Sequence, residues 1–181
     1  MAGGVHKALL DWGGKALIQH QCDLLLHAGC DPVVVVTGHD GEAVARAVPD
    51  GCLVVHNAQW ESGRSSSLEL GAKTIDPDVE AVVVVAVDQP LSADVIGTLL
   101  GAGQHPLTIP RDPQGQTGHP VLLGAHVWPQ LCAATVHPQG LRSIVAPLRP
   151  SAREVDVNAP VKWDLNTAEQ YRAAHQTCFG R

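Results

Sequence analysis

The sequence predicts an α/β fold, a three-layer sandwich in which helices cover both faces of a mostly parallel, doubly wound sheet. Short segments that are apolar on both faces, such as residues 33–36 and 81–87, alternate with segments of helical periodicity. Strands that alternate with helices in this way are typical of parallel sheets. Polar loops follow several of these strands, and we expect them at one edge of the sheet, where open α/β sheets bind ligands.

The first half of the chain predicts the order helix, strand, helix, strand, helix. Residues 17–28 carry apolar side chains at helical spacing, and Gly29 provides a glycine stop. The four valines at 33–36 are too few for a helix and too uniformly apolar for a one-sided sheet. The helix at 65–75 is expected to be capped by a serine and to stop near Gly71. The other segments are a short helix at 40–48 and a strand at 52–57.

The second half begins with residues 81–87, which we expect to be the most strongly buried strand. A helix follows over 92–103, with Ser92 or Asp94 near its cap. Residues 111–124 combine a polar, glycine-rich loop with a strand. The other expected elements are strands at 106–110 and 152–157, short helices at 128–135 and 141–148, and a terminal helix at 167–176 capped by Thr167.

Length and charge limit the possible functions. The 181 residues fit one domain, 1–181, large enough to bury a sizeable core. The formal net charge is −6 and the Lys and Arg residues are scattered, so we expect no nucleic-acid partner. If the substrate is a phosphate, a metal ion or a few placed cations must offset this negative charge.

The cysteines and the apolar runs predict a cytoplasmic protein without a membrane partner. Five cysteines form no CxxC pair, which favours reduced thiols over a zinc knuckle or a disulfide framework. No signal-peptide apolar region leads the chain, and the longest apolar run is well short of the roughly 20 residues that span a bilayer.

Asp88 is the first candidate functional residue, because it directly follows the apolar run 81–87. Pro90 cannot continue a strand ladder and disfavours helix at Gln89, so the carboxylate lies on a stiff extended turn. A carboxylate there is suited to binding a hard cation. The alternative is that Asp88 only accepts hydrogen bonds from turn amides.

Three further polar segments are expected at the same edge, and each has a structural alternative. Residues 57–68 follow a strand and begin a helix, where one serine could serve only as a cap. Residues 115–123 offer glycines that let the backbone approach a ligand, and an imidazole at His119, but could form a surface hairpin. Residues 164–171 start a helix with Thr167, an ordinary cap in the alternative interpretation.

Taken together, these segments resemble the molybdenum-cofactor nucleotidyltransferase group of the glycosyltransferase-A-like family, most closely its molybdopterin cytidylyltransferase branch. The resemblance runs nearly end to end and implies a nucleotide-diphospho-sugar transferase-like fold. The segments that carry it are HKALLDWGGKALIQH, NAQWESGRSSSLELG, VDQP, GHPVLL, QGLRSIV and DLNTAEQY.

The resemblance implies that Mg²⁺ bridges the nucleotide phosphates and is held by Asp88 and Asn166. Asn166 departs from the commoner Asp, although an amide oxygen is also a hard ligand. Lys7 and Asp88 are the expected catalytic residues, with Lys7 on the phosphates; without the resemblance, Lys7 would be a solvated lysine near a chain end. His6 replaces the family's usual proline before this lysine.

The resemblance also implies the substrates. A terminal phosphate on a molybdopterin-type cofactor attacks the α-phosphorus of an NTP, CTP being favoured over GTP, and pyrophosphate leaves. A molybdoenzyme that receives the cofactor is left open as a further partner. The expected nucleotide-binding residues are Gly3, Gly4, Lys7, Thr37 and Gly38. The expected acceptor-binding residues are Asn57, Ser66, Ser67, Gly118, His119 and Pro120, with Arg142 as an extra phosphate contact.

Two other functions stay open, and so does the start of the chain. One is an NAD(P)H-dependent oxidoreductase acting on a heteroaromatic substrate, although no GxGxxG turn is present. The other is a non-catalytic chaperone for cofactor insertion. The family usually begins with a buried strand and a phosphate-binding loop, and Met1 falls where that loop's methionine would be. We therefore expect the first strand to be missing, through an internal start or a truncated form with little activity.

Overall fold

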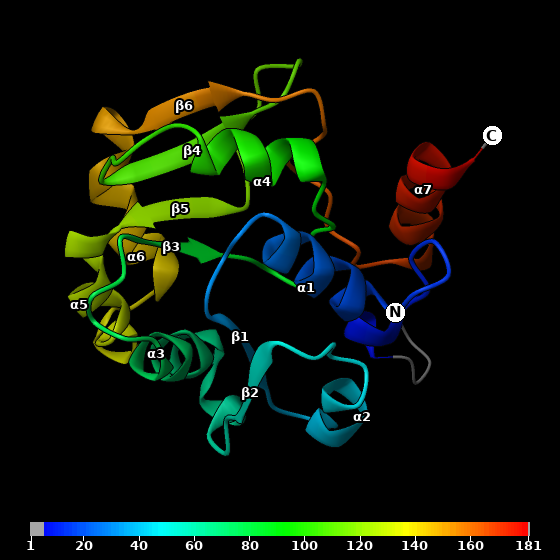
Figure 1. Cartoon of the computed structure of the whole chain (residues 1–181), viewed down its shortest axis with the longest axis horizontal. Helices are drawn as coiled ribbons and strands as arrows, with labels where there is room; N and C mark the ends of the chain where they lie inside the picture. The colour runs from blue at the N-terminus through cyan, green and yellow to red at the C-terminus, as the bar shows by residue number, and fades with distance from the viewer. Residues whose placement is uncertain (1–5, 181) are drawn as a thin grey trace.

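The computed structural model describes residues 6–180 and confirms the α/β fold (Figure 1). Helices and strands alternate along the first two thirds of the chain, as the sequence predicts. The strands are β1 (Val33–Thr37), β2 (Cys52–His56), β3 (Ala81–Val84), β4 (Leu107–Arg111), β5 (Val121–Gly124) and β6 (Arg153–Asp156). The α-helices are α1 (Leu17–His27), α2 (Gly41–Ala45), α3 (Arg64–Thr74), α4 (Ala93–Leu100), α5 (Trp128–Leu131), α6 (Leu141–Val145) and α7 (Ala168–Phe179). Short 3-10 helices are η1 (Lys7–Leu9), η2 (Trp60–Ser62), η3 (Ala125–Val127), η4 (Ala134–Val136) and η5 (Ala146–Ser151).

The strands form two sheets within residues 6–180, where the sequence predicted one mostly parallel sheet. β1 and β2 pair in parallel, and the second sheet has the order β3-β5-β4-β6. In the second sheet β4 and β6 are parallel, whereas β5 runs antiparallel to both of its neighbours. The short connection from β4 to β5 explains this direction, because a parallel crossover needs a dozen or more residues. The expectation of a missing first strand stays a prediction.

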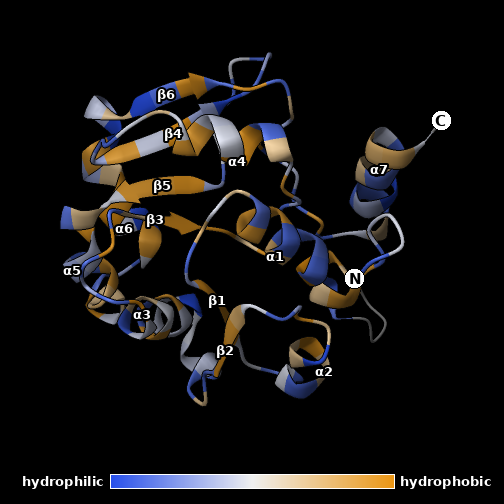
Figure 2. Ribbon diagram, viewed as in Figure 1, coloured by the Kyte–Doolittle hydropathy of each residue, from blue (hydrophilic) through white to orange (hydrophobic). Residues whose placement is uncertain are grey.

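Side chains of the second sheet point alternately to its two faces, and helices cover both faces, which gives three layers. On one face, Val121 and Leu123 of β5 belong to a core cluster with Ile144 of α6. On the other face, Leu122 belongs to a cluster with Leu99 of α4. Because successive side chains of a strand point to opposite faces, both faces of β5 are apolar and covered by helices. Figure 2 shows this apolar character along β5 and β3.

β3 is shorter and less buried than the sequence predicted. It ends at Val84 rather than residue 87, and only Val82 among its residues is buried, whereas all of β5 is buried. β3 lies at the edge of its sheet, with β5 as its partner in the ladder. Beyond the strand, the side-chain amide of Gln21 on α1 donates to the Val87 carbonyl at 2.7 Å. A helix side chain therefore satisfies backbone that the longer strand would have paired.

The serine cap and the stop near Gly71 that were expected for α3 were wrong, although the helix lies within one residue of the expected range. The helix begins at Arg64 after Gly63, whose φ is 111°, and no side chain caps it. It continues through Gly71 to Thr74. A Cβ at Gly71 would lie 3.0 Å from a Val36 methyl group, so this glycine allows close packing on β1 and does not end the helix.

Two of the predicted helix caps are confirmed. The Ser92 hydroxyl accepts from the Val95 amide at 3.4 Å and caps α4, which decides between Ser92 and Asp94. Thr167 and Gln170 form a reciprocal capping box at the start of α7. None of the helices within residues 6–180 is long and apolar enough to cross a membrane.

Candidate active site

Three of the predicted site residues converge. The ammonium of Lys7 in η1 lies 3.2 Å from Asp88 Oδ2 and 2.6 Å from Asn166 Oδ1. These residues are 81 and 159 positions from Lys7 in the chain, so tertiary structure alone brings them together. The side chains of Lys7 and Asp88 are 32% and 24% exposed, and solvent can therefore reach them.

The loops that carry Asp88 and Asn166 are joined by hydrogen bonds. The Leu165 amide donates to the Asp88 carbonyl at 2.9 Å. The Gln89 side-chain amide donates to Asp164 Oδ1 at 2.7 Å. The second contact gives the DQP and DLNT segments a direct connection that the sequence analysis did not anticipate. Asp164 lies in the polar segment 164–171 but was not one of the predicted site residues.

Aromatic packing holds the start of α7 against the segment that follows Lys7. Trp12 is 2% exposed and forms a core cluster with Leu165 and Ala174. The Tyr171 hydroxyl donates to the Asp11 carbonyl at 2.7 Å. In Figure 1 the N-terminal segment accordingly lies beside the base of α7. This packing fixes the two segments from which Lys7 and Asn166 reach the site.

Asp88 and Asn166 present the kind of oxygen donors that hard divalent cations prefer. Both are hard donors, but residues 6–180 contain no group of three or more His, Cys, Asp or Glu that could hold a metal. Mg²⁺ usually takes one or two carboxylates together with substrate phosphates and water, rather than a complete protein cage. Two protein oxygens are therefore a partial ligand set, which other ligands would have to complete.

The loop Gly118-His119-Pro120 packs closely on the segment that leads to Asp164. A Cβ at Gly118 would overlap the Val161 carbonyl, so only glycine permits this approach. His119 Nδ1 is buried and has no hydrogen-bond partner within residues 6–180. Burial lowers the pKa of His119, with Asp164 and Asp88 opposing and Arg149 and Arg64 reinforcing the shift.

These electrostatic neighbours of His119 identify two arginines that the sequence analysis missed. Arg149 in η5 donates to Thr117 Oγ1 at 2.9 Å, beside the His119 loop. Arg64 begins α3. Gly140 packs directly on Ser65, which brings the start of α6, with Arg142, near the start of α3. No motif spacing connects these arginines, so the only sequence signal was their rarity in an acidic chain.

The side chain of Asn57 forms hydrogen bonds to Ser66 and Ser67. Asn57 is 4% exposed, and its amide donates to Ser66 Oγ at 2.8 Å and Ser67 Oγ at 2.9 Å. Asn57 Oδ1 accepts from the Gln59 amide at 2.9 Å. These bonds fold the connection between β2 and α3. A cavity of about 340 Å³ lies beside it, lined in part by Glu69, whose pKa is lowered to about 2 by hydrogen bonds from Lys73 and Thr135.

Thr37 and Gly38 meet this same connection. The backbone amide of Asn57 donates to the Thr37 carbonyl at 2.8 Å, and Thr37 is 6% exposed. A Cβ at Gly38 would lie 2.6 Å from Trp60 Cβ, which makes glycine necessary there. The other two predicted nucleotide-binding residues, Gly3 and Gly4, lie outside the described residues.

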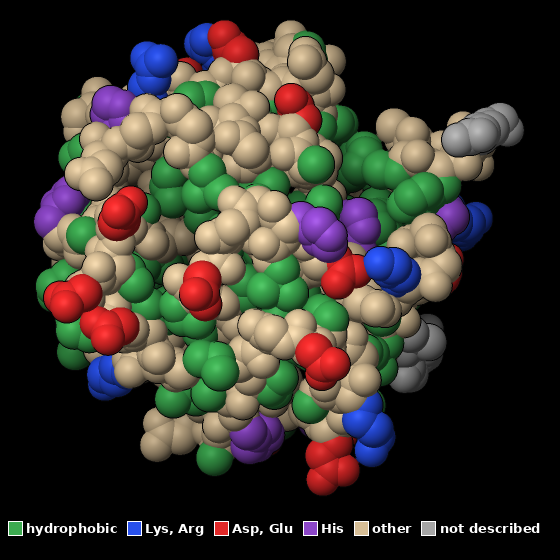
Figure 3. Space-filling view, viewed as in Figure 1, with side chains coloured by type: hydrophobic (Ala, Val, Ile, Leu, Met, Phe, Trp, Pro, Cys, Tyr) green, Lys and Arg blue, Asp and Glu red, His purple; other side chains and the backbone are tan. Residues whose placement is uncertain are grey.

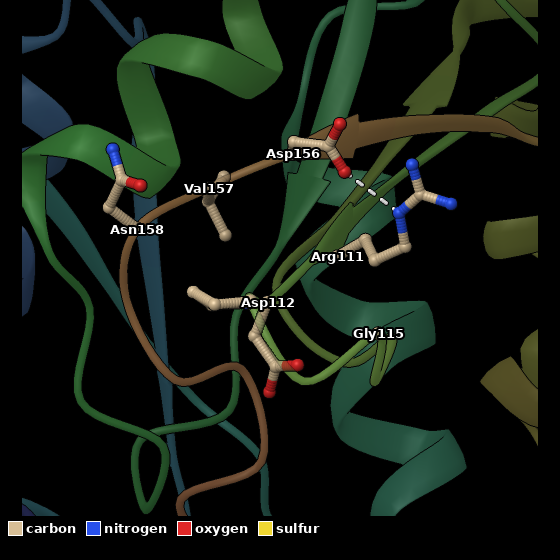
Figure 4. Close-up of a pocket in the computed structure, with 7 residues that line it drawn as sticks. Arg111, Asp112, Gly115, Asp156, Val157 and Asn158 are labelled. Atoms are coloured by element: carbon tan, nitrogen blue, oxygen red, sulfur yellow. Dashed lines mark hydrogen bonds and ion pairs between the residues drawn. The ribbon is translucent and has the colours of Figure 1, made fainter.

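A second cavity of about 330 Å³ lies at the ends of β4 and β6 and involves none of the predicted site residues (Figure 4). Arg111 closes one side and pairs with Asp156 at 2.8 Å. The buried Asp112 carboxylate accepts from the Gln114 and Gln116 amides and shapes the loop. These polar groups hydrogen-bond or pair with neighbouring protein groups.

On the face of the molecule in Figure 3, Lys and Arg side chains lie singly among other residue types, without a continuous basic surface.

Comparison with known proteins identifies the family of the chain. The profile of the MobA-like NTP transferase domain matches residues 1–155. The chain belongs to this family. The match and the fold support a nucleotidyltransferase activity, as the resemblance implied.

Individual relatives of the family differ in their activities. Nicotine blue oxidoreductase from Paenarthrobacter nicotinovorans is 32% identical over 147 residues, 75% of this chain and 71% of that protein. Molybdenum cofactor guanylyltransferase from Xanthomonas euvesicatoria pv. vesicatoria (strain 85-10) is 29% identical over 171 residues, 88% of this chain and 85% of that protein.

Solved structures confirm the nucleotide-diphospho-sugar transferase-like fold. The crystal structure of Rv0371c from Mycobacterium tuberculosis H37Rv has a TM-score of 0.81 at 24% identity, covering 96% of this chain and 90% of that one. Its complex with manganese has a TM-score of 0.75 at 22% identity, covering 94% and 91%.

Proposed function

We propose that this protein transfers a nucleoside monophosphate from an NTP to the phosphate of a molybdopterin-type cofactor and releases pyrophosphate. We take CTP as favoured over GTP and Mg²⁺ as the ion. The observation that carries the proposal is the convergence of Lys7, Asp88 and Asn166, because it joins a cation to two hard oxygen donors. The family match supports the reaction class, the guanylyltransferase relative supports the acceptor, and the manganese complex supports a divalent cation.

In the proposed reaction, an acceptor phosphate oxygen forms a bond to the α-phosphorus of the NTP. The bond from the α-phosphorus to its bridging oxygen breaks, and pyrophosphate leaves with that electron pair. The acceptor phosphate is already ionised near neutral pH, so the site needs no strong general base. Catalysis then depends on positioning and on the neutralisation of negative charge.

The chain's own residues divide these tasks. Asp88 and Asn166 would hold the Mg²⁺, which would supply Lewis-acid neutralisation of phosphate charge. Lys7 binds the triphosphate as a fixed cation, together with the loop that contains Gly3 and Gly4. Thr37 and Gly38 form the nucleotide side of the pocket, where their contacts with the Asn57 connection supply a rigid wall.

The acceptor binds the loop Gly118-His119-Pro120 in this proposal. The lowered pKa of His119 keeps its imidazole neutral near pH 7. Arg142 contributes a contact to the acceptor phosphate. Asn57, Ser66 and Ser67 shape the adjoining wall through their mutual hydrogen bonds. We place the reaction in the cytoplasm, and a molybdoenzyme is the candidate recipient of the product.

Pyrophosphate release tests the proposal. The purified protein is mixed with Mg²⁺, a molybdopterin-type acceptor and either CTP or GTP, and pyrophosphate is measured over time. We expect release that depends on both the ion and the acceptor, and that is faster with CTP. Absence of release with both nucleotides would contradict the proposal and favour a non-catalytic chaperone.

An oxidoreductase is the second candidate, favoured by the similarity to nicotine blue oxidoreductase. It requires a reduced nicotinamide as electron donor and a heteroaromatic pigment as acceptor. NADH or NADPH oxidation in the presence of such a pigment, with no pyrophosphate formed from NTPs, would establish this alternative.

A further inference from the structure

The ammonium of Lys7 donates hydrogen bonds to the two oxygens, one from Asp88 and one from Asn166, that are proposed to bind the metal ion. It contacts Asp88 Oδ2 at 3.2 Å and Asn166 Oδ1 at 2.6 Å. Within residues 6–180, Lys7 is the only Lys or Arg that forms an ion pair with Asp88. An ammonium and a divalent cation cannot both occupy this position, because like charges at such a separation repel strongly.

We propose that Lys7 closes the metal site until a nucleotide arrives. The triphosphate draws the ammonium away from Asp88 and Asn166, and the exposed oxygens then bind the divalent ion. Nucleotide and metal binding are therefore coupled through one side chain. This inference rests on the proposed function, since it assigns the triphosphate to Lys7 and the ion to Asp88 and Asn166.

The charges of these side chains support the coupling. Asp88 supplies the one formal negative charge of the three residues, and Asn166 is a neutral amide. With Lys7 in place the three side chains sum to zero charge, so they give a divalent ion little electrostatic attraction. Once Lys7 has moved, the carboxylate is uncompensated and the triphosphate adds further negative oxygens. The ion then gains both its ligands and its charge balance.

Lys7 is also able to move between the two positions. Lysine is a compact charge on a flexible four-carbon stem, with three donors that can be redirected. Its side chain is 32% exposed, so it leaves Asp88 without crossing the core. The η1 segment itself is fixed, because Ala8 is buried and the His6 side chain caps it. The ammonium can therefore exchange partners while the backbone stays in place.

The test is binding of Mn²⁺ alone, measured by the electron paramagnetic resonance signal of the unbound ion. The variant Lys7→Met removes the ammonium and keeps the length of the side chain. We expect it to bind Mn²⁺ about five-fold more tightly than the wild type, the factor that corresponds to a partly exposed ion pair. The matched control is Lys15→Met, which removes another lysine paired with a carboxylate, Asp23 at 2.6 Å, and should leave the Mn²⁺ affinity unchanged.

Nucleotide coupling gives the second measurement. Addition of CTP or GTP should raise the Mn²⁺ affinity of the wild type more than that of Lys7→Met, because only the wild type has an ammonium to displace. Equal or weaker Mn²⁺ binding by a folded Lys7→Met, checked by thermal unfolding, would overturn the inference. If neither protein bound a nucleotide, the proposed function would fail, whereas the comparison of Mn²⁺ affinities without nucleotide would still decide the role of Lys7.

Discussion

The Lys7–Asp88–Asn166 centre and the Asn57–Ser66–Ser67 connection use polar side chains in opposite ways. At the centre, side chains from three remote segments meet at a partly exposed position and include opposite charges. In the connection the side chains are neutral and near one another in sequence, Asn57 and Ser66 are buried, and the Asn57 amide donates to both serines. Conversion of either set to apolar residues should therefore have different consequences: loss of turnover at the centre and loss of stability in the connection.

The largest expected effect is that of Asp88→Asn on turnover. The change keeps the shape of the side chain but removes the charge that holds the ion. We expect pyrophosphate release to fall by about 100-fold or more, the scale of losing one electrostatic contact to a transition state. Thermal unfolding should be little changed. Asp23→Asn is the matched control, and pyrophosphate release that survives in Asp88→Asn would remove this residue from the centre.

Asn57→Ala should show the opposite pattern. The buried Ser66 hydroxyl and the partly buried Ser67 hydroxyl lose their donor, and the Gln59 amide loses its acceptor. We expect the free energy of unfolding to fall by about 1–3 kcal/mol, the cost of unsatisfied buried polar groups. Urea titration measures this loss. A stable Asn57→Ala with strongly reduced turnover would place Asn57 at the substrate and break the contrast between the two regions.

His119→Ala is expected to act on one substrate only. The Gly118-His119-Pro120 loop is assigned to the acceptor, so the KM for the acceptor should rise by about ten-fold, which corresponds to one lost hydrogen bond of ~1.4 kcal/mol. The Kd for the NTP should change little. Steady-state kinetics for the acceptor and calorimetry for the NTP separate these quantities, and equal losses in both would show that the loop is assigned to the wrong side.

The smallest expected effect is a pH dependence of stability from His119. Its pKa is lower in the folded protein than the ordinary value of 6.5, chiefly through burial. The unfolded chain therefore binds the proton more readily, and stability is lost as the pH falls from the ordinary value through the folded one. The free energy of unfolding should decline over this range more in the wild type than in His119→Gln. Parallel curves for the two proteins would show that His119 does not titrate in this way.

Local sequence signals predicted most elements of the fold and pointed to Asp88, whereas Lys7 and Asn166 were expected only from the family resemblance. The valines of β1, the capping box at Thr167 and the position of Asp88 after an apolar run each depend on neighbours in sequence. The signals failed where tertiary contacts decide the outcome. Gly71 lies within α3 and packs on Val36, and beyond the end of β3 the Gln21 side chain of α1 donates to the Val87 carbonyl.

The same distinction explains what was missed at the site. Asp164 matters through its contact with Gln89, and Arg149 through its position beside the His119 loop. Both depend on segments that are distant in the chain. The direction of β5 was missed for another reason, since its apolar run has no feature that distinguishes a parallel strand from an antiparallel one.

The central claim is that Lys7, Asp88 and Asn166 form a centre for nucleotidyl transfer, and the fate of the α-phosphorus tests it most directly. CTP or GTP labelled at the α-phosphate is incubated with Mg²⁺ and a molybdopterin-type acceptor, and the products are separated. We predict that the label appears on the acceptor with the wild type and remains in the nucleotide with Asp88→Asn. Label that never reaches the acceptor with an active, folded wild-type protein, or that reaches it equally with Asp88→Asn, would contradict the account.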